Sequence, residues 1–199
     1  MTRRALYCCM LMLASTLISH AARAEDLVPE WLTRSRLLAQ QLGTELKAEL
    51  TSALANAGPT GAIGVCRTRA PEIAARLSRE SGALVSRTAL RVRNPANAPD
   101  DLQHAILEQF ADDLAAGRTE MPLEAAVEIN RGGKIEHRYM RAIPMDAMCL
   151  ACHGQQLAPA VAAAIAKAYP EDQATGFEQG QLRGAFSVIW PATPPAPNR

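Results

Sequence analysis

The first long segment with a regular hydrophobic pattern covers residues 29–56. Its large apolar residues recur three or four positions apart, which places them on one face of an α-helix. The sequence therefore predicts a long amphipathic helix that ends at the Gly-Pro-Thr-Gly run, 58–61. A second helix is predicted over residues 62–78, and Pro71 has to bend or restart it because proline lacks an N–H group. The apolar face of the first helix consists of Trp31, Leu32, Leu37, Leu38, Leu42, Leu46 and Leu50.

The middle of the chain changes from helical to extended periodicity. Residues 84–93 alternate as a β-strand does, with the even-numbered residues on one face. The segment 94–99 holds two prolines and two asparagines, so we expect a fixed loop there. Asp100 is a suitable N-cap for the next predicted helix, which runs to about residue 116.

The C-terminal half predicts a β-hairpin, a helix and a closing strand. Apolar runs at 125–129 and 135–143 flank a Gly-Gly turn. A helix is predicted at 159–169 and a strand at 184–190. Helices followed by a mainly antiparallel sheet with inserted helices define an α+β fold class. Because neither a repeat nor a linker divides the sequence, we expect a single domain over residues 25–190.

The N-terminus has the features of an export signal. Arg3 and Arg4 precede a mostly apolar run at 5–18, and an Ala-Arg-Ala sequence then fits the rule for cleavage. The apolar run is shorter than the ~20 residues that a membrane-spanning helix needs. We therefore predict a signal peptide at residues 1–24, a periplasmic location, and no membrane span after cleavage.

Charge and composition narrow the class of partner. Loss of the predicted signal peptide would remove three arginines and no acidic residue, so the formal charge would fall from +1 to −2. A nearly neutral chain gives no reason to expect nucleic acid as a partner. Aromatic residues make up only 4% of the chain, so a flat cofactor could supply apolar surface that aromatic rings usually provide. The proline-rich tail at 191–199 is predicted to be disordered.

Candidate chemistry is concentrated in the sequence Cys149-Leu150-Ala151-Cys152-His153. This C-x-x-C-H pattern is typical of covalent c-type haem attachment, in which two thiols add to the porphyrin vinyl groups and the imidazole binds the iron. Residues three and four apart share one face of a helical turn, so all three side chains can meet one macrocycle. Asp146 and Gly154 are suitable N-cap and C′ residues for a single short helix around the motif. We therefore predict one covalent haem c per chain.

A redox C-x-x-C pair and a zinc site are the alternatives for this motif. A thioredoxin-like pair should follow a strand and open a long helix within a βαβ unit, whereas here a predicted hairpin precedes it and a glycine follows it. Zinc would need a fourth ligand at metal-site spacing, and none lies nearby in the sequence. An exported chain favours haem attachment over both alternatives.

Cys66 is the third cysteine of the predicted mature chain, and it has two interpretations. Most lone cysteines are small buried hydrophobic residues, and such a role explains it without a cofactor. It could instead be the second axial ligand of the iron, a position for which several methionines and histidines compete. These competing residues are Met121, Met140, Met145, Met148, His104 and His137.

Arg87, Arg91 and Arg93 all have odd numbers within the predicted strand and therefore share one of its faces. A solvated strand face would explain these charges without any ligand. The functional interpretation is that one or two of them bind haem propionates through charge-assisted hydrogen bonds, each worth ~1.5–3 kcal/mol. All three are candidate cofactor-binding residues.

Several segments together resemble a known family, the extracytoplasmic c-type haem domains with a PAS-like fold. Members of that family occur alone in the periplasm or as the sensing part of signal-transduction proteins. The resemblance covers nearly the whole predicted mature chain. It is carried by the V-C-x-x-x-A-P element within 65–74, the R-N-P-x-N-x-P loop within 87–100, the haem motif at 149–154 and the closing segment 180–188.

The resemblance implies a PAS-like antiparallel sheet and a haem held through Cys149 and Cys152. It implies His153 as one axial ligand of the iron and Cys66 as the other. It also implies a sensor module, which a redox or signalling partner protein would read and which a diatomic gas could bind.

Three functions are compatible with these sequence features. We expect a redox or small-ligand sensor rather than an enzyme. Soluble electron transfer would need the same haem, ligation that survives both oxidation states, and a docking patch. A peroxidase-like haem enzyme would need an open coordination position, which Cys66 would fill. The apolar face of the first helix could serve the core or a homodimer interface.

Overall fold

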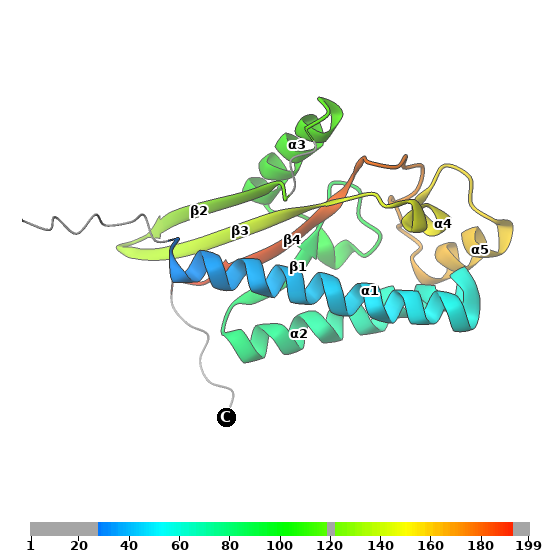
Figure 1. The fold of residues 1–199 in the computed structure, drawn as a ribbon, viewed down its shortest axis with the longest axis horizontal. Helices are drawn as coiled ribbons and strands as arrows, with labels where there is room; N and C mark the ends of the chain where they lie inside the picture. The colour runs from blue at the N-terminus through cyan, green and yellow to red at the C-terminus, as the bar shows by residue number, and fades with distance from the viewer. Residues whose placement is uncertain (1–27, 119–121, 193–199) are drawn as a thin grey trace, which may run out of the picture.

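The structure is a computed structural model that describes residues 28–118 and 122–192 (Figure 1). The predicted signal peptide at 1–24 and all but the first two residues of the predicted tail lie outside the described residues. The helices are α1 (Glu30–Gly64), a π-helical turn (Val65–Arg69), α2 (Ala70–Ser81), α3 (Asp101–Ala115), α4 (Leu150–His153) and α5 (Pro159–Ala168), with short 3₁₀ turns at Pro95–Asn97 and Ala147–Cys149. The strands are β1 (Leu84–Thr88), β2 (Glu124–Arg131), β3 (Lys134–Pro144) and β4 (Leu182–Trp190).

The four strands form one sheet in the order β1-β4-β3-β2, and all neighbours are antiparallel. The predicted hairpin is present as β2 and β3. Gly132 and Gly133 join these strands with φ angles of 62° and 87°, which favour glycine at both positions. The closing strand β4 lies inside the sheet, between β1 and β3. The predicted α+β class with an antiparallel sheet and a long N-terminal helix is therefore confirmed.

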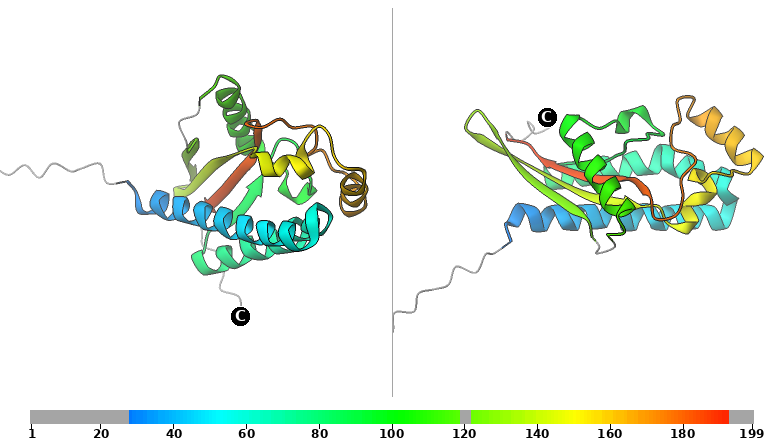
Figure 2. Two further views of the ribbon diagram at one scale, coloured as in Figure 1. Left: turned by 45° about the vertical axis from the view of Figure 1, so that its right-hand side comes forward. Right: turned by 90° about the horizontal axis from the view of Figure 1, so that it is seen from above.

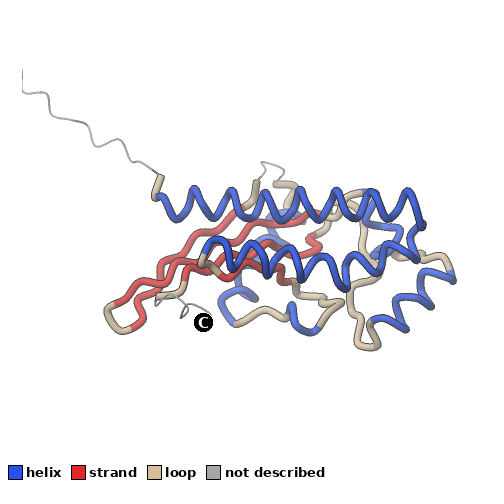
Figure 3. The backbone as a smooth tube through the Cα atoms, turned by 90° about the horizontal axis from the view of Figure 1, so that it is seen from below, coloured by secondary structure: helices blue, strands red, loops and turns tan. Residues whose placement is uncertain are grey.

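Helices cover both faces of the sheet (Figure 2). Helices α1 and α2 lie side by side across one face, as the view from below shows (Figure 3), and α3 packs on the other face. Successive residues of a strand point to opposite faces, so Tyr139 packs with α1 and α2 whereas Met140 packs with α3. Both side chains are almost fully buried. The sheet therefore separates two hydrophobic clusters.

The start of α3 agrees with the prediction from its capping residue. The Asp100 side chain accepts a hydrogen bond from the Gln103 N–H at 2.9 Å, and the Gln103 side chain accepts one from the Asp100 N–H at 3.0 Å. The Gln103 side-chain amide also donates to the Ser187 hydroxyl at 3.0 Å. This reciprocal cap fixes the helix start, and the contact with Ser187 ties α3 to β4.

Helix α1 is longer than predicted because helical structure resumes after the Gly-Pro break and continues to Gly64. The break is nevertheless present as a kink, since Gly58 has a φ of 65° and a non-helical ψ. After the kink the chain forms the π-helical turn Val65–Arg69, and α2 begins directly before Pro71. Long as α1 is, no helix within the described residues is apolar enough to cross a membrane.

The predicted strand over residues 84–93 is wrong in its second half, because β1 ends at Thr88. The chain leaves the sheet there to bond with the segment before β4. The Val92 carbonyl accepts a hydrogen bond from the Gln173 N–H at 2.9 Å, and Arg91 and Arg93 bond to the same segment. These contacts outweigh the alternating pattern, so the three odd-numbered arginines do not share one strand face.

Candidate functional site

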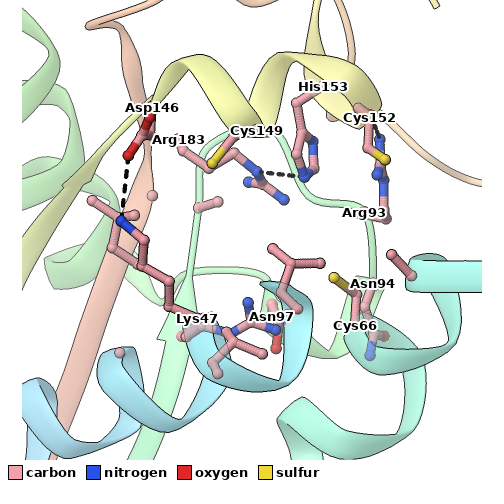
Figure 4. A pocket seen from close by; sticks show the side chains of 18 of the residues that line it. Lys47, Cys66, Arg93, Asn94, Asn97, Asp146, Cys149, Cys152, His153 and Arg183 are labelled. Atoms are coloured by element: carbon pink, nitrogen blue, oxygen red, sulfur yellow. Dashed lines mark hydrogen bonds and ion pairs between the residues drawn. The ribbon is translucent and has the colours of Figure 1, made fainter. Parts of the chain in front are cut away.

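A cavity of about 380 Å³ (Figure 4) is lined by residues next to α4, at the end of the molecule where Figure 1 shows α4 and α5. Its volume is within the range typical of small-molecule and cofactor sites. The second half of α1 and the π-helical turn form one wall, and the segment with the C-x-x-C-H motif forms the opposite wall. Strand β1, the loop after it and the start of β4 close the side.

Much of the cavity lining is apolar. Residue 43 is a glycine, and a Cβ atom there would lie 2.9 Å from the Phe186 ring, so this position lets the ring approach α1 closely. The motif side contributes two thiols and a methionine. The apolar lining residues of α1, the sheet and the loop after β1 include Leu46, Leu50, Leu54, Ala62, Ile63, Val92, Ile143 and Phe186.

The motif segment forms the predicted short helical structure. Asp146 is its N-cap, and the Asp146 carboxylate accepts a bond from the Met148 N–H at 3.4 Å. Cys149 and Cys152 are half-buried free cysteines that line the cavity. Burial raises the pKa of both thiols, so they are protonated in this site.

Gly154 does not adopt the left-handed conformation predicted for a C′ residue. Its φ and ψ are −70° and 178°, which is extended backbone open to any residue. The need for glycine is steric instead, because a Cβ atom here would lie 2.6 Å from the Leu150 carbonyl oxygen. The Gly154 N–H donates to that same oxygen at 2.8 Å, so the close approach closes the end of α4.

His153 has a defined tautomer. Its Nδ1 lies 2.6 Å from the Ala174 carbonyl oxygen, and only an N–H can bond to a carbonyl, so Nδ1 carries the proton. The other nitrogen, Nε2, therefore keeps its lone pair, and His153 lines the cavity. Burial, followed by the positive charges of Arg183 and Arg93, lowers the pKa of His153 to about 2. The imidazole is neutral, as a metal ligand has to be.

Cys66 lies on the wall opposite the motif. It belongs to the π-helical turn, and Figure 4 shows its sulfur directed into the cavity, toward the side that holds His153 and Cys152. A π-helical turn inside helical structure is a frequent feature of functional sites. The structure therefore places the four predicted haem-motif and axial-ligand residues around one cavity.

The competing sulfur and imidazole residues are placed less favourably. Met148 lines the cavity, but it lies on the same wall as Cys149. Met140 and Met145 are buried in hydrophobic clusters and do not line the cavity. His104 and His137 do not line the cavity either, and Met121 lies outside the described residues.

The three candidate arginines have three different environments. Arg87 lines the cavity, and among the described residues no acid or carbonyl pairs with its side chain. Burial lowers the pKa of Arg87, which reflects a guanidinium without a counter-charge. Arg93 also lines the cavity but is bound to Asp172, with Nε 2.9 Å from a carboxylate oxygen. Arg91 lies outside the cavity, and its guanidinium carbon is 4.1 Å from the centre of the Phe177 ring.

Arg183 is a cavity residue that no sequence pattern singled out. Its Nε lies 3.5 Å from His153 Nε2, and within the described part of the chain no carboxylate contacts it. Burial and the nearby Arg87 and Arg93 charges lower the pKa of Arg183 to about 10. Its only sequence signal is its place in the closing segment 180–188, at the second residue of β4. Arg87 and Arg183 together leave two positive charges uncompensated.

The fold and the cavity define a class of protein, an α+β domain with two thiols and an imidazole on one cavity wall and a third thiol on the other. The sequence profile of the Tll0287-like family matches residues 11–191, so the chain belongs to the Tll0287-like family. The crystal structure of the cyanobacterial heme-protein Tll0287 is similar, with a TM-score of 0.65 and 26% sequence identity. That match covers 85% of this chain and 99% of the other. Among curated proteins, none matches the sequence.

Proposed function

We propose that this protein is a periplasmic c-type haem protein with a PAS-like domain, which carries one haem bound covalently to Cys149 and Cys152. The observation that carries the proposal is the arrangement of these two thiols and His153 on one cavity wall, opposite Cys66. The similarity to a heme-protein of the same family supports it. The predicted export signal supplies the compartment in which such an attachment is made.

The residues around the cavity fit a haem in polarity and in charge. Apolar side chains line two sides, which suits the porphyrin faces. The two propionates of a haem would offset the charges of Arg87 and Arg183, which have no carboxylate partner among the described residues. Arg91 was a candidate for the same role, but its guanidinium bonds to the carbonyls of Gln173 and Thr175 outside the cavity.

His153 and Cys66 are the proposed axial ligands. The hydrogen bond from His153 Nδ1 to the Ala174 carbonyl fixes the tautomer that leaves Nε2 for the iron. Arg183 has to turn away from Nε2 when this nitrogen binds iron, which frees its guanidinium for a carboxylate. Cys66 would bind as a thiolate from the opposite side, and thiolate ligation is typical of low-potential haems.

The position of Cys66 supports the sensing part of this proposal. A bound haem would supply an iron that can change its charge by one unit and can accept a diatomic gas. An anionic Cys66 thiolate would bind a ferrous centre less strongly than a ferric one, because the ferrous charge is smaller, so reduction or gas binding would favour its release. Cys66 lies in the π-helical turn between α1 and α2, and its movement would shift the start of α2 for a partner protein to detect.

Mass spectrometry and spectroscopy of the processed protein test this proposal. The protein is produced in a host with the haem c maturation machinery, and we expect an intact mass one haem above that of the polypeptide. A mass equal to that of the bare chain contradicts the proposal. We further expect CO to bind the reduced form. Unchanged six-coordinate ligation in both oxidation states with and without CO would favour soluble electron transfer over sensing.

The Cys66→Ala variant tests the axial thiolate. We expect it to lose the thiolate features of the ferric absorption and EPR spectra, because alanine offers no ligand. Met148→Ala is the matched control, since Met148 is another sulfur-containing residue of the same cavity, and its ferric spectra should match the wild type. An unaltered ferric spectrum in Cys66→Ala would falsify the thiolate assignment.

A further inference from the structure

Arg93 and Asp172 form a buried ion pair next to the motif. Their side chains are only 7% and 8% exposed. Arg93 Nε donates to one carboxylate oxygen at 2.9 Å and Nη2 donates to the other at 3.2 Å, which is the two-point geometry of a strong guanidinium–carboxylate pair. The pair joins the loop after β1 to the segment between α5 and β4.

The same pair binds backbone groups of two residues next to His153, the preceding Cys152 and Ala174, which bonds to the imidazole. Arg93 Nη2 donates to the Cys152 carbonyl at 2.7 Å and to the Ala174 carbonyl at 3.1 Å. Asp172 accepts a bond from the Ala174 N–H at 3.0 Å. Both polar groups of the Ala174 backbone are therefore bound by the ion pair, and its carbonyl is the acceptor for His153 Nδ1.

The geometry points to Arg93 and Asp172 as positioning residues for His153. Together they hold the Ala174 carbonyl where it accepts the Nδ1 proton, so that Nε2 is the nitrogen left for a metal. This inference rests on the proposed haem function, which it deepens by naming the residues behind the axial imidazole. Arg93 was a candidate for propionate binding, and the structure shows most of its donors engaged in this other task.

A hydrogen bond at Nδ1 makes an imidazole a better donor to its metal, and it keeps the ring in one orientation. Loss of such a partner typically lowers metal affinity by about 10- to 100-fold. Weaker donation from His153 would destabilise the ferric state more than the ferrous state. The reduction potential should therefore rise when the ion pair is disturbed.

Arg93→Lys is the sharpest variant because it keeps the positive charge and removes the planar fork. In the full-length chain without haem, ¹⁵N NMR of His153 should show an increase of about tenfold in the Nε2–H tautomer. Arg183 favours the Nδ1–H tautomer as well, so every chain compared keeps Arg183. In the haem-loaded protein we expect the ferric–ferrous equilibrium to shift about tenfold toward ferrous, which is 59 mV for a one-electron couple.

Arg91→Lys is the matched control. Arg91 also bonds to the 172–175 segment, through the Gln173 and Thr175 carbonyls, but it forms no hydrogen bond with Ala174. Its tautomer ratio and potential should stay within about twofold of the wild type. Asp172→Asn is a second test that keeps the side chain's size, and it should shift both readouts in the same direction as Arg93→Lys. Circular dichroism identifies any variant that fails to fold.

The inference is overturned if folded Arg93→Lys and Asp172→Asn both keep the wild-type tautomer and potential. It is also overturned if Arg91→Lys shifts both readouts as much as they do. A wild-type chain that never acquires haem would instead contradict the proposed function, and the tautomer measurement would still decide the role of the ion pair.

Discussion

The cavity lining begins at Gly43 and divides α1 into a first and a second half, which have the same leucine spacing and very different neighbours. In the first half, Ala39 and Leu42 are fully buried against α2 and the sheet. In the second half, Leu46 and Leu50 continue the four-residue repeat but line the cavity. One apolar face of α1 therefore packs against protein at one end and lines the cavity at the other.

Three arginines show the same contrast, although Lys47 and Arg93 of the cavity lining are paired with Asp146 and Asp172. Beside the first half of α1, Arg36 Nε donates to Glu124 at 2.9 Å, and the Tyr139 hydroxyl donates to the same carboxylate at 2.8 Å. Beside the second half, Arg87 and Arg183 have no carboxylate partner in the part of the chain described. Unmatched charge and unmatched apolar surface therefore occur together, where a cofactor with both properties would bind.

The largest effect should come from replacing both motif thiols. In Cys149→Ser/Cys152→Ser no thioether can form, so the covalent mass increase should be lost completely. The sheet and the first half of α1 should still fold, because their core contains neither residue. Intact mass and hydrogen exchange check this, with reduced protection expected around α4 and α5. A uniform loss of hydrogen-exchange protection over the whole chain would contradict this difference between the core and the cavity end of α1.

Leu42→Ala and Leu46→Ala compare two positions one helical turn apart. Leu42→Ala removes a fully buried side chain and should cost about 2–5 kcal/mol of unfolding free energy. Leu46→Ala should cost less than half of that in the haem-free chain, because Leu46 borders the cavity. Urea denaturation measures both. Equal losses of unfolding free energy for the two variants in the haem-free chain would show that Leu46 is packed as tightly as Leu42.

Arg87→Gln removes one of the two unpaired charges. In the haem-loaded protein it should cost about 1.5–3 kcal/mol of unfolding free energy, because a bond to a propionate is lost. In the haem-free chain it should cost little, since the guanidinium has no partner among the described residues to lose there. Arg91→Gln serves as the control and should change the two forms equally. The quantity to compare is the difference between loaded and haem-free stabilities.

Glu124→Gln tests the bonds that Arg36 and Tyr139 make beside the first half of α1. It should have the smallest effect, a loss of about 1–2 kcal/mol of unfolding free energy near neutral pH. Burial raises the pKa of Glu124, but hydrogen bonds from Arg36 and Tyr139 outweigh it, and the net pKa lies below its ordinary value of 4.5. The stabilisation is present above that value and is lost as pH falls through the folded-state pKa.

Glu124→Gln should therefore flatten the loss of unfolding free energy on acidification below about pH 4.5. The exposed Glu30, whose side chain is 86% exposed, provides the control variant Glu30→Gln, which should keep the wild-type acid profile. An unchanged acid profile in Glu124→Gln would mean that the bonds from Arg36 and Tyr139 to Glu124 contribute nothing to the unfolding free energy.

Local patterns were enough to predict most helices and strands. The leucine repeat, the Asp100 cap and the Gly132-Gly133 turn each depend on neighbours in sequence, and each element is present, although α1 continues beyond its predicted end. The end of β1 could not be predicted in this way. It depends on bonds from the loop after it to residues about eighty positions later, which alternation does not encode.

The candidate site divides along the same line. The motif cysteines and His153 could be found from their spacing alone, whereas Cys66 needed a family resemblance because it lies more than eighty positions away. The roles of the arginines could not be assigned from strand parity once the strand ended early. Arg183 carries no local signal of its own and becomes visible only when the start of β4 is placed beside His153.

The straight part of α1 also sets a length scale for communication. At a rise of about 1.5 Å per residue, residues 30–57 span roughly 40 Å, and the cofactor cavity lies toward the far end from Glu30 (Figure 1). If the cavity holds the proposed haem, a partner that exchanges electrons with it would have to approach near α4 and α5. A partner bound near Glu30 would be too far away to contact the cavity. It could detect a change there only through a tilt or twist of α1.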